Sequence, residues 1–321
     1  MTAEAPALLD IIEDRGSHPS HSGDRIWPET NCYLDLWIEL LHTLGHDPVP
    51  MYACALSADH DGEQWTFVKP DPADLRDLYG LQVAEETLWR PVLDTVESGR
   101  ARGLLHTVEV DSWWLPDTAG TDYRSGHVKT TIVPLRVDRA AAQMTYVHNG
   151  GVHRLEGDDF AGVFNLGPTS EWVLLPYVEQ VRRMVPAGAV VDPLTIVRAH
   201  LNRRPSVNPV EALGRSVAAA VEWLPEAGVE VFHVWAFATL RQCGATAEIA
   251  ADLAEQLPGL GADGGETAAP LLREVSAGAK AVQFKMARAA RGRAVDVTDT
   301  MALMAENWQQ ALDIIDASVR R

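Results

Sequence analysis

The strand and helix patterns of the sequence separate near residue 160, and this separation limits the folds open to the chain. Before it, short runs rich in β-branched and aromatic residues alternate with helical patterns. After it, long stretches with helical periodicity follow one another, and the strand signal almost disappears. The sequence therefore predicts an α+β domain at residues 1–160, followed by an α-helical domain at residues 161–321.

The pattern also places the individual elements. A helix is expected at residues 31–44, because its apolar residues recur at helical spacing and Gly45 marks its end. A second short helix is expected after Asp71, and residues 259–266 are expected to be a flexible connector. Strands are expected at residues 52–56, 64–68, 105–110, 128–133 and 143–147, the last two joined by a turn at Asp138. Long helices are expected at residues 193–201, 209–224, 231–257, 268–290 and 298–319.

Charge and cysteine content exclude several classes of function. The chain has 45 acidic and 27 basic residues, a net charge of −18, which argues against binding to nucleic acid or to an anionic membrane surface. Its three cysteines are an odd number at wide spacing, which fits neither a disulfide framework nor a zinc site. The start of the chain lacks the pattern of a signal peptide, and no apolar stretch is long enough to span a membrane. We expect a reducing, cytoplasmic setting.

Cys32 is the first candidate for chemistry, because it stands where a loop is expected to become a helix. The first turn of a helix presents unpaired backbone N–H groups and the positive end of the helix dipole. Both favour a thiolate over a thiol, and the same N–H groups could hold the oxyanion of a tetrahedral intermediate. The alternative is that Cys32 is only a small buried residue on a helix.

His127 and Asn149 lie near the ends of two strands that we expect to pair. If residues 127–137 and 143–149 form a hairpin about the Asp138 turn, His127 and Asn149 meet at one edge of the sheet. A Cys on a helix N-terminus, a His on a strand and an Asn on the next strand form the arrangement of nucleophile, base and orienting residue. The sequence therefore predicts a catalytic triad of Cys32, His127 and Asn149.

Several segments carry a family resemblance: WPETNCYLDLWIELLHTLG, VEVDSWWLPDTAGTDYRSGHVKTTI, YVHNGG, FHVWAFATLRQCGATAEIAADL and GAKAVQFKMARA. In these segments the chain resembles, over nearly its whole length, the bacterial family called domain of unknown function 1839. More distantly, the N-terminal half resembles butirosin biosynthesis protein H-like acyltransferases of the papain-like cysteine protease superfamily. The shared pattern is a Cys that opens a helix, then Asp, aromatic residues and Leu-Pro, then a His on a strand.

The distant resemblance implies a fold and a reaction. It implies a papain-like domain, in which the helix with the Cys packs on an antiparallel sheet. It also implies an acyltransferase that moves an aminoacyl group from a carrier-protein thioester to an amine, with Cys32 as acyl acceptor and His127 as base. By the same resemblance, Asn149 best matches the third triad position, and Asp138 is the alternative. No cofactor or metal is bound in this interpretation, because the phosphopantetheine thioester arrives on the donor carrier protein. The partners are then an acyl or aminoacyl carrier protein and a small amine acceptor.

The sequence departs from the papain-like pattern before Cys32. Such enzymes usually carry a Gln about six residues before the Cys as an oxyanion donor, and this chain has none there. The candidate substitutes are Asn31, Arg25 and the backbone N–H of Cys32.

Further residues are expected to line the cleft. In the N-terminal domain these are Trp27, Glu29, Asp111 and Trp113, and in the helical domain His233, Arg241 and Lys280, whose alternative role is helix packing.

Two alternative functions stay open from the sequence. The same triad acting on water would make a cysteine peptidase or amidase, and a chain without catalysis would be a papain-like binding module. The net charge adds a requirement to the leading interpretation, because carrier proteins are usually acidic as well. A carrier would need a basic landing patch, and the candidates are Arg182 with Arg183, Arg203 with Arg204, and residues 285–293.

Overall fold

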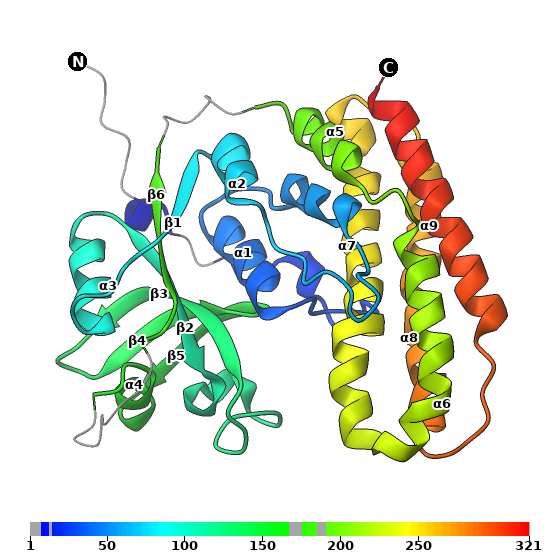
Figure 1. Ribbon diagram of the computed structural model, residues 1–321. Coiled ribbons are helices and arrows are strands. Elements are labelled where there is room, and N and C mark those ends of the chain that lie inside the picture. Colours follow the sequence, from blue (N-terminus) through cyan, green and yellow to red (C-terminus); the bar gives the residue numbers. More distant parts are fainter. Residues whose placement is uncertain (1–7, 13–14, 167–174, 185–190, 321) are drawn as a thin grey trace. The chain divides into compact units, whose positions relative to one another are not determined.

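The computed structural model describes residues 8–12, 15–166, 175–184 and 191–320 (Figure 1). The chain divides into two compact units, and each takes residues from several parts of the sequence. The first unit comprises Met1–Pro19, Cys32–Pro48 and Asp71–Val190. The second comprises Ser20–Asn31, Val49–Pro70 and Val191–Arg321. The short segment before Cys32 therefore belongs to the second unit, although Cys32 itself belongs to the first.

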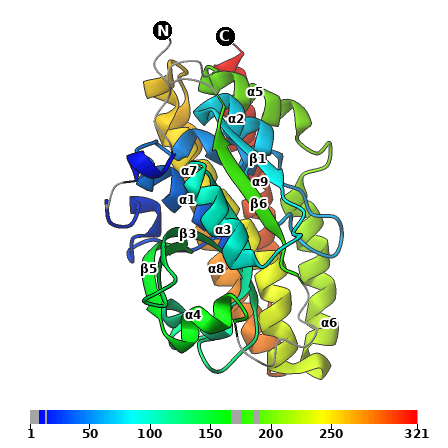
Figure 2. The same ribbon diagram turned by 90° about the vertical axis from the view of Figure 1, so that its left-hand side faces the viewer.

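The first unit is built on a six-stranded antiparallel sheet of order β1-β6-β2-β3-β4-β5. Strand β6 is late in the sequence but pairs with both β1 and β2, as in the pairs Val83 with Val181 and Leu105 with Val181. Figure 2 shows β1 and β6 running next to each other. The strands are β1 (Leu81–Glu85), β2 (Leu105–Asp111), β3 (Lys129–Asp138), β4 (Gln143–His148), β5 (Gly151–Glu156) and β6 (Val178–Arg183).

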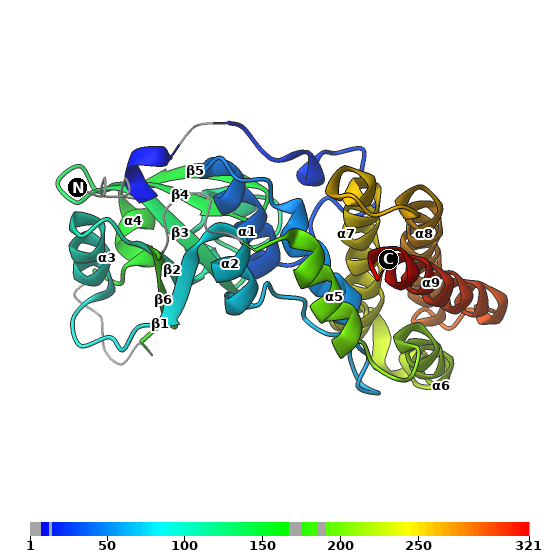
Figure 3. The ribbon, with the colours of Figure 1, turned by 90° about the horizontal axis from the view of Figure 1, so that it is seen from above.

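Helices cover both faces of this sheet (Figure 3). Helices α3 (Val92–Ala101) and α4 (Asp158–Val163) lie on one face, where their apolar residues join a core with residues such as Val108 and Ile132. Helix α1 (Cys32–Thr43) lies on the other face against β3 and β4, and it is buried along most of its length. Helix α2 (Pro72–Tyr79) contacts β1. The side chain of Asp71 caps its start by accepting a hydrogen bond from the Ala73 N–H.

The second unit is mainly helical. It contains α5 (Pro193–Arg203), α6 (Pro209–Ala236), α7 (Gln242–Gln256), α8 (Gly265–Ala289) and α9 (Thr298–Val319), with a π-helix at Phe237–Arg241 between α6 and α7. Gly228 has φ 85° and ψ 179° and interrupts α6, so the chain reverses there, and the second part of α6 continues into α7 (Figure 1). Helices α7, α8 and α9 pack in sequence, and α6 packs on α8 and α9. Trp65 lies among these helices, with its ring 5.7 Å from that of Trp308.

The structure confirms an α+β N-terminal region followed by a helical part, and it corrects several elements. The strands predicted at residues 105–110, 128–133 and 143–147 are β2, β3 and β4, and β3 and β4 pair as a hairpin. The strands predicted at residues 52–56 and 64–68 are wrong. Val49–Ser57 is a 3₁₀ helix, and near residues 64–68 the only pairing is an isolated bridge between His60 and Trp65. The 3₁₀ helix is buried along nearly its whole length against α5 and α7, so its apolar run has no exposed face to reveal a helical period.

The predicted helices of the second half are present, and the helix predicted at residues 298–319 has the observed bounds of α9. The sequence did not predict β1, β5 or β6. Because β6 follows residue 160, the sheet takes residues from both sides of the expected domain boundary. Among the described helices, none is both long and apolar enough to cross a membrane.

Candidate functional site

The candidate site lies where β2 ends and β3 begins. The last residue pair between these strands is Asp111 with Lys129, and the Ser112 N–H donates to the Val128 carbonyl at 2.9 Å. After β2 the chain turns into a short 3₁₀ helix, which Asp111 caps by accepting a hydrogen bond from the Trp113 N–H at 3.0 Å. This local turn places Asp111 and Trp113 beside the residue that leads into β3, which is His127.

His127 is held on two sides. Its Nδ1 lies 2.6 Å from Oδ2 of Asp111, and its ring stacks on Trp113 with 4.6 Å between centroids and 7° between planes. A carboxylate that accepts from Nδ1–H fixes the tautomer, so Nε2 is the basic nitrogen of the neutral ring. The side chain of His127 is 71% exposed, so a substrate can approach it. Chemically, a histidine oriented in this way could act as a general base.

The same face of the sheet carries a row of polar side chains. Side chains alternate along a strand, so Thr107, Glu109 and Asp111 of β2 project to one face. It is the face of α1, because Thr107 and Tyr33 of α1 both donate to Oε2 of Glu179, at 2.7 and 2.6 Å. Asp111 and His127 are therefore on the face of the sheet that α1 covers.

Glu179 fixes the first turn of α1 on the sheet. It is buried, and its second carboxylate oxygen accepts a hydrogen bond from the Tyr177 hydroxyl at 3.2 Å. Burial, together with the charge of Glu179, raises the pKa of Tyr177 to about 12 and that of Tyr33 well above its usual range. Both phenols therefore stay protonated and donate, which satisfies a carboxylate that would otherwise be costly to bury.

Cys32 is the first residue of α1, as the sequence predicted. It is partly buried, and none of the three cysteines forms a disulfide. The neighbouring residue, Tyr33, anchors this helix end through Glu179. The contacts of His127 in the structure are with Asp111 and Trp113, and a contact between His127 and Cys32 stays a prediction.

The structure corrects the expected partner of His127. Asn149 lies in the turn between β4 and β5 with φ 44°. The pairing of Val133 with Val147, extended by two residues, sets Asn149 opposite Thr131. That position is about 13 Å from His127 along β3, at about 3.3 Å per residue. Asp138 ends β3 and is therefore at the opposite end of the strand from His127. The residue bonded to His127 is Asp111, which the sequence placed only in the cleft.

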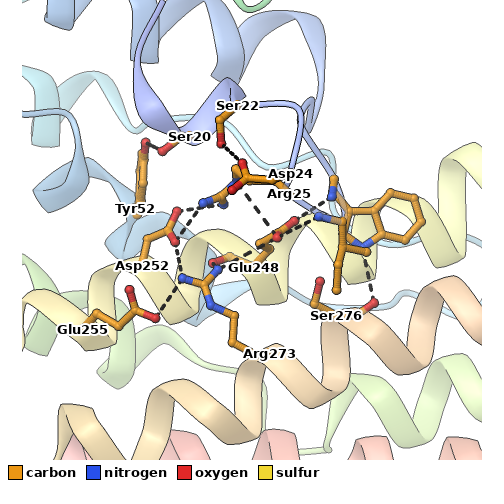
Figure 4. A network of polar contacts seen from close by, with 12 residues as sticks. Ser20, Ser22, Asp24, Arg25, Tyr52, Glu248, Asp252, Glu255, Arg273 and Ser276 are labelled. Atoms are coloured by element: carbon orange, nitrogen blue, oxygen red, sulfur yellow. Dashed lines mark hydrogen bonds and ion pairs between the residues drawn. The ribbon is translucent and has the colours of Figure 1, made fainter.

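The other predicted cleft residues on the N-terminal side belong to the second unit. Trp27 donates its backbone N–H to Oε2 of Glu248 at 2.8 Å and its indole N–H to the Ser276 carbonyl at 3.3 Å. Arg25 forms a two-pronged ion pair with Asp252, at 3.1 and 2.8 Å, which Arg273 also contacts (Figure 4). The segment that leads to Cys32 is therefore fixed by carboxylates of α7.

Two predicted helical residues meet this segment. The ammonium group of Lys280 lies 4.0 Å from the ring centroid of Trp27, and Arg241 is 3.2 Å from the Glu29 carbonyl and 3.6 Å from its carboxylate. Burial, followed by the charge of Arg241, lowers the pKa of Lys280. His233, by contrast, is exposed, and its ring contacts Phe232. The expected place of His233, Arg241 and Lys280 along the cleft stays a prediction.

Asn31, the first candidate for an oxyanion donor, is buried and already bonded. Its amide donates to the Val68 carbonyl at 2.9 Å and lies 3.5 Å from Oε1 of Gln242. The amide of Gln242 in turn donates to the Thr30 carbonyl at 3.2 Å. These bonds favour the backbone N–H of Cys32 over the Asn31 amide as the oxyanion donor.

The sequence missed a buried polar cluster that supports the site. Nδ1 of His148 is 2.5 Å from Oδ2 of Asp117, and its Nε2 is 2.7 Å from the Thr130 hydroxyl. Tyr146 also donates to Asp117. Burial acts to raise the pKa of Asp117, but the bonds from His148 and Tyr146 outweigh it, so the pKa is lowered. Asp117 thereby ties the loop between Asp111 and His127 to β4. No sequence pattern signals a contact between residues this far apart.

Nothing in the described part of the chain gathers three or more His, Cys, Asp or Glu side chains as a metal site requires.

The fold and the site together define an α+β protein in which an antiparallel sheet carries a His–Asp pair at the end of a strand and is followed by a helical part. The chain belongs to the DUF1839 family. The model of the DUF1839 N-terminal domain matches residues 16–183, and that of the DUF1839 C-terminal domain matches residues 190–317. No curated protein matches the chain.

Proposed function

We propose that the protein is a cysteine-dependent acyltransferase with a papain-like catalytic arrangement. In this proposal Cys32 takes an aminoacyl group from a carrier-protein thioester and passes it to an amine. The observation that carries the proposal is His127, which is oriented by the Asp111 carboxylate and the Trp113 ring while its Nε2 stays accessible. Support also comes from Cys32, which opens the helix that packs on the same face of the sheet.

The reaction has two steps. The Cys32 thiolate attacks the thioester carbonyl, the bond to the carrier sulfur breaks, and the carrier thiol leaves with a proton from His127. The amine then attacks the acyl-Cys32 carbonyl, His127 takes the amine proton, and the Cys32 thiolate is released. Asp111 stabilises the imidazolium, which is present before the first step and forms again when His127 takes the amine proton. Cys32 has to approach Nε2 of His127 for this chemistry, and such catalytic hydrogen bonds are often long until substrate binds.

The test of the proposal is acylation of Cys32. We expect incubation with a panel of aminoacyl thioesters to add one acyl mass to the wild type and none to Cys32→Ala. His127→Gln should slow acylation by about 10²- to 10⁴-fold, the usual contribution of a general base. Asp111→Asn should also slow it, whereas Asn149→Ala, which removes the side chain originally predicted for this role, should not.

Cys54→Ala is the matched control for Cys32→Ala, because Cys54 is buried in the 3₁₀ helix of the second unit. A folded wild type that gains no acyl mass from any thioester would contradict catalysis and favour the papain-like binding module. Equal acylation of wild type and His127→Gln would remove His127 as the base.

Hydrolysis is the second candidate function, and the exposure of His127 favours it, because water can reach Nε2. The two outcomes separate when acyl-Cys32 is offered an amine. An amide product supports transfer, and free acid alone, whatever amine is present, identifies a peptidase or amidase.

The proposed carrier-protein partner requires a basic surface, and the contacts and positions of the candidate residues support one of them. Arg204 is paired with Asp313 at 3.2 Å. Lys285 and Arg182 both bind neutral groups, the Asp296 backbone carbonyl and the Gln82 side chain, so these contacts leave both charges uncompensated. We propose Arg182 as the landing site, because it belongs to the same unit as Cys32 and His127. Arg182→Glu should slow acylation by carrier thioesters and leave acylation by small thioesters unchanged.

A further inference from the structure

The helical unit contains a cavity of about 790 Å³, a size typical of small-molecule sites. All of its lining residues belong to the second unit, whereas Cys32, Asp111 and His127 belong to the first. One wall is a short loop, and the other wall is formed by α6 and the residues just before it. The lining residues are Asp59, His60, Asp61, Gly62, Glu63, Pro205, Ser206, Val207, Ala212, Arg215, Ser216, Ala219, Trp223 and Trp235.

Two tryptophans form an aromatic part of the wall. Trp223 and Trp235 are twelve residues apart, which in a straight helix would separate them by about 18 Å at 1.5 Å per residue. The reversal at Gly228 brings them together, and their rings lie 6.1 Å apart at 89°. Trp223 remains 40% exposed, so apolar ring surface is available to a ligand.

The acidic wall is a preformed loop. Oδ1 of Asp61 accepts hydrogen bonds from the N–H groups of Glu63 and Gln64, both at 2.8 Å. The Ser216 hydroxyl of α6 donates to the Gly62 carbonyl at 2.9 Å. The loop ends at Trp65, whose indole N–H donates to the Thr246 hydroxyl at 3.1 Å. A ligand would therefore meet Asp59, Asp61 and Glu63 without ordering the loop first.

Charges of both signs act on the buried imidazole of His60 in this cavity. Burial lowers the pKa of His60, Asp61 and Asp59 act to raise it, and Arg215 acts to lower it. Arg215 nevertheless makes no ion pair with these carboxylates or with any other described residue. Nδ1 of His60 accepts from the Gly62 N–H at 3.1 Å, and its buried Nε2 has no partner in the described structure. The guanidinium of Arg215 and the carboxylates of the loop thus line the same cavity without bonding to each other.

We propose that this cavity binds an α-amino acid with an apolar side chain, as the zwitterion. The ammonium group binds at the carboxylates of Asp61 and Glu63, the carboxylate binds Arg215, and the side chain packs on Trp223 and Trp235. Charge-assisted hydrogen bonds and aromatic contact are the interactions that these groups offer. The inference does not depend on acyl transfer at Cys32.

The test is isothermal titration of the full chain with L-phenylalanine, L-phenylalaninamide and N-acetyl-L-phenylalanine. The amide lacks the carboxylate, and the acetyl derivative lacks the ammonium group. We expect L-phenylalanine to bind and each derivative to bind at least tenfold more weakly, because each derivative loses one charge-assisted hydrogen bond.

Variants assign the binding to this cavity. Arg215→Gln and Glu63→Gln should each weaken L-phenylalanine binding about tenfold or more, and Trp223→Leu should also weaken it. Glu222→Gln is the matched control, because Glu222 lies next to Trp223 on α6 but does not line the cavity. Thermal unfolding of each variant checks that the fold is kept.

Three results would overturn the proposal. The first is no binding of L-phenylalanine or L-leucine up to about 10 mM, which is weaker than any specific site of this kind should be. The second is equal binding of L-phenylalaninamide, which would identify a simple amine site. The third is binding that Arg215→Gln and Glu63→Gln leave unchanged, which would place the amino acid elsewhere on the protein.

Discussion

At the scale of single residues, Trp27 shows how a glycine permits a close contact. A Cβ atom at Gly244 of α7 would lie 2.5 Å from Nε1 of Trp27, closer than real Cβ contacts. The missing side chain lets the indole lie against α7, donate to Ser276 and receive Lys280 on its face. Trp27 belongs to the segment that leads into Cys32, so this contact holds the chain just before the proposed nucleophile.

We expect Gly244→Ala to destabilise the protein by about 1–3 kcal/mol, because a buried ring has to move to admit the methyl group. Urea unfolding measures the change. Gly214→Ala is the control, since a Cβ there meets Met301 at an ordinary 3.6 Å. That variant should be neutral or stabilising by up to about 1 kcal/mol. Equal effects of the two variants would mean that Trp27 is not tightly packed against α7.

The sequence predicted the candidate site only in part. It placed Cys32 at a helix start and His127 beside a strand, because both positions follow from local patterns. It chose Asn149 as the partner of His127 because a hairpin brings strand ends together. Which residue lies beside His127, however, depends on the pairing of β2 with β3, and no local sequence pattern reveals that pairing. Asp111 can therefore be identified as the partner of His127 only from the structure of the sheet.

At the scale of elements, the same limit appears in the sheet. Strands β2, β3 and β4 were predictable from their β-branched runs, and β3 and β4 are also joined by a short turn. Strand β6 carries charged residues such as Glu179, Arg182 and Arg183, so its sequence lacks a strand signal. It becomes a strand because it pairs on both sides, with β1 and β2. Tertiary pairing overrides local preference here.

The reversal within α6 leads to a prediction about Gly228. Its φ of 85° and ψ of 179° lie in a region open almost only to glycine, and a Cβ there would meet nothing within 4 Å. Gly228→Ala should therefore lower stability by about 1–3 kcal/mol through backbone strain alone. Thermal unfolding checks this, with Gly259→Ala as control, because that glycine also has open space but no positive φ. No difference between the two variants would contradict the strain argument.

At the scale of the whole molecule, the acidic residues behind the net charge of −18 have different roles in different places. Several carboxylates are fixed by partners, as Asp252 is by Arg25 and Arg273, so they hold structure and do not repel. The loop at residues 59–63 instead concentrates carboxylates that have no cationic partner among the described residues. The same acidity that argues against nucleic-acid binding therefore favours a cationic ligand group at this loop.

Buried and half-buried histidines in the two units make the stability of the protein depend on pH. Burial is the largest effect on His46, His60 and His106, and it lowers the pKa of each. The unfolded chain takes up protons near the ordinary imidazole value of 6.5, whereas the folded protein does so only at lower pH. Protonation therefore favours the unfolded state, and stability is complete above pH 6.5 and lost as the pH falls below it.

We expect the free energy of unfolding in urea to be lower at about pH 5.5 than at about pH 7.5, by up to about 1.4 kcal/mol for each histidine whose pKa is lowered in the folded state. His60→Gln tests the cause, because glutamine keeps a polar side chain but takes up no proton. The decrease between the two pH values should be smaller in this variant than in the wild type. The change in overall charge is nearly the same for both proteins, so the difference between them isolates His60. A decrease of the same size in both would show that the buried imidazole of His60 does not contribute to the pH dependence.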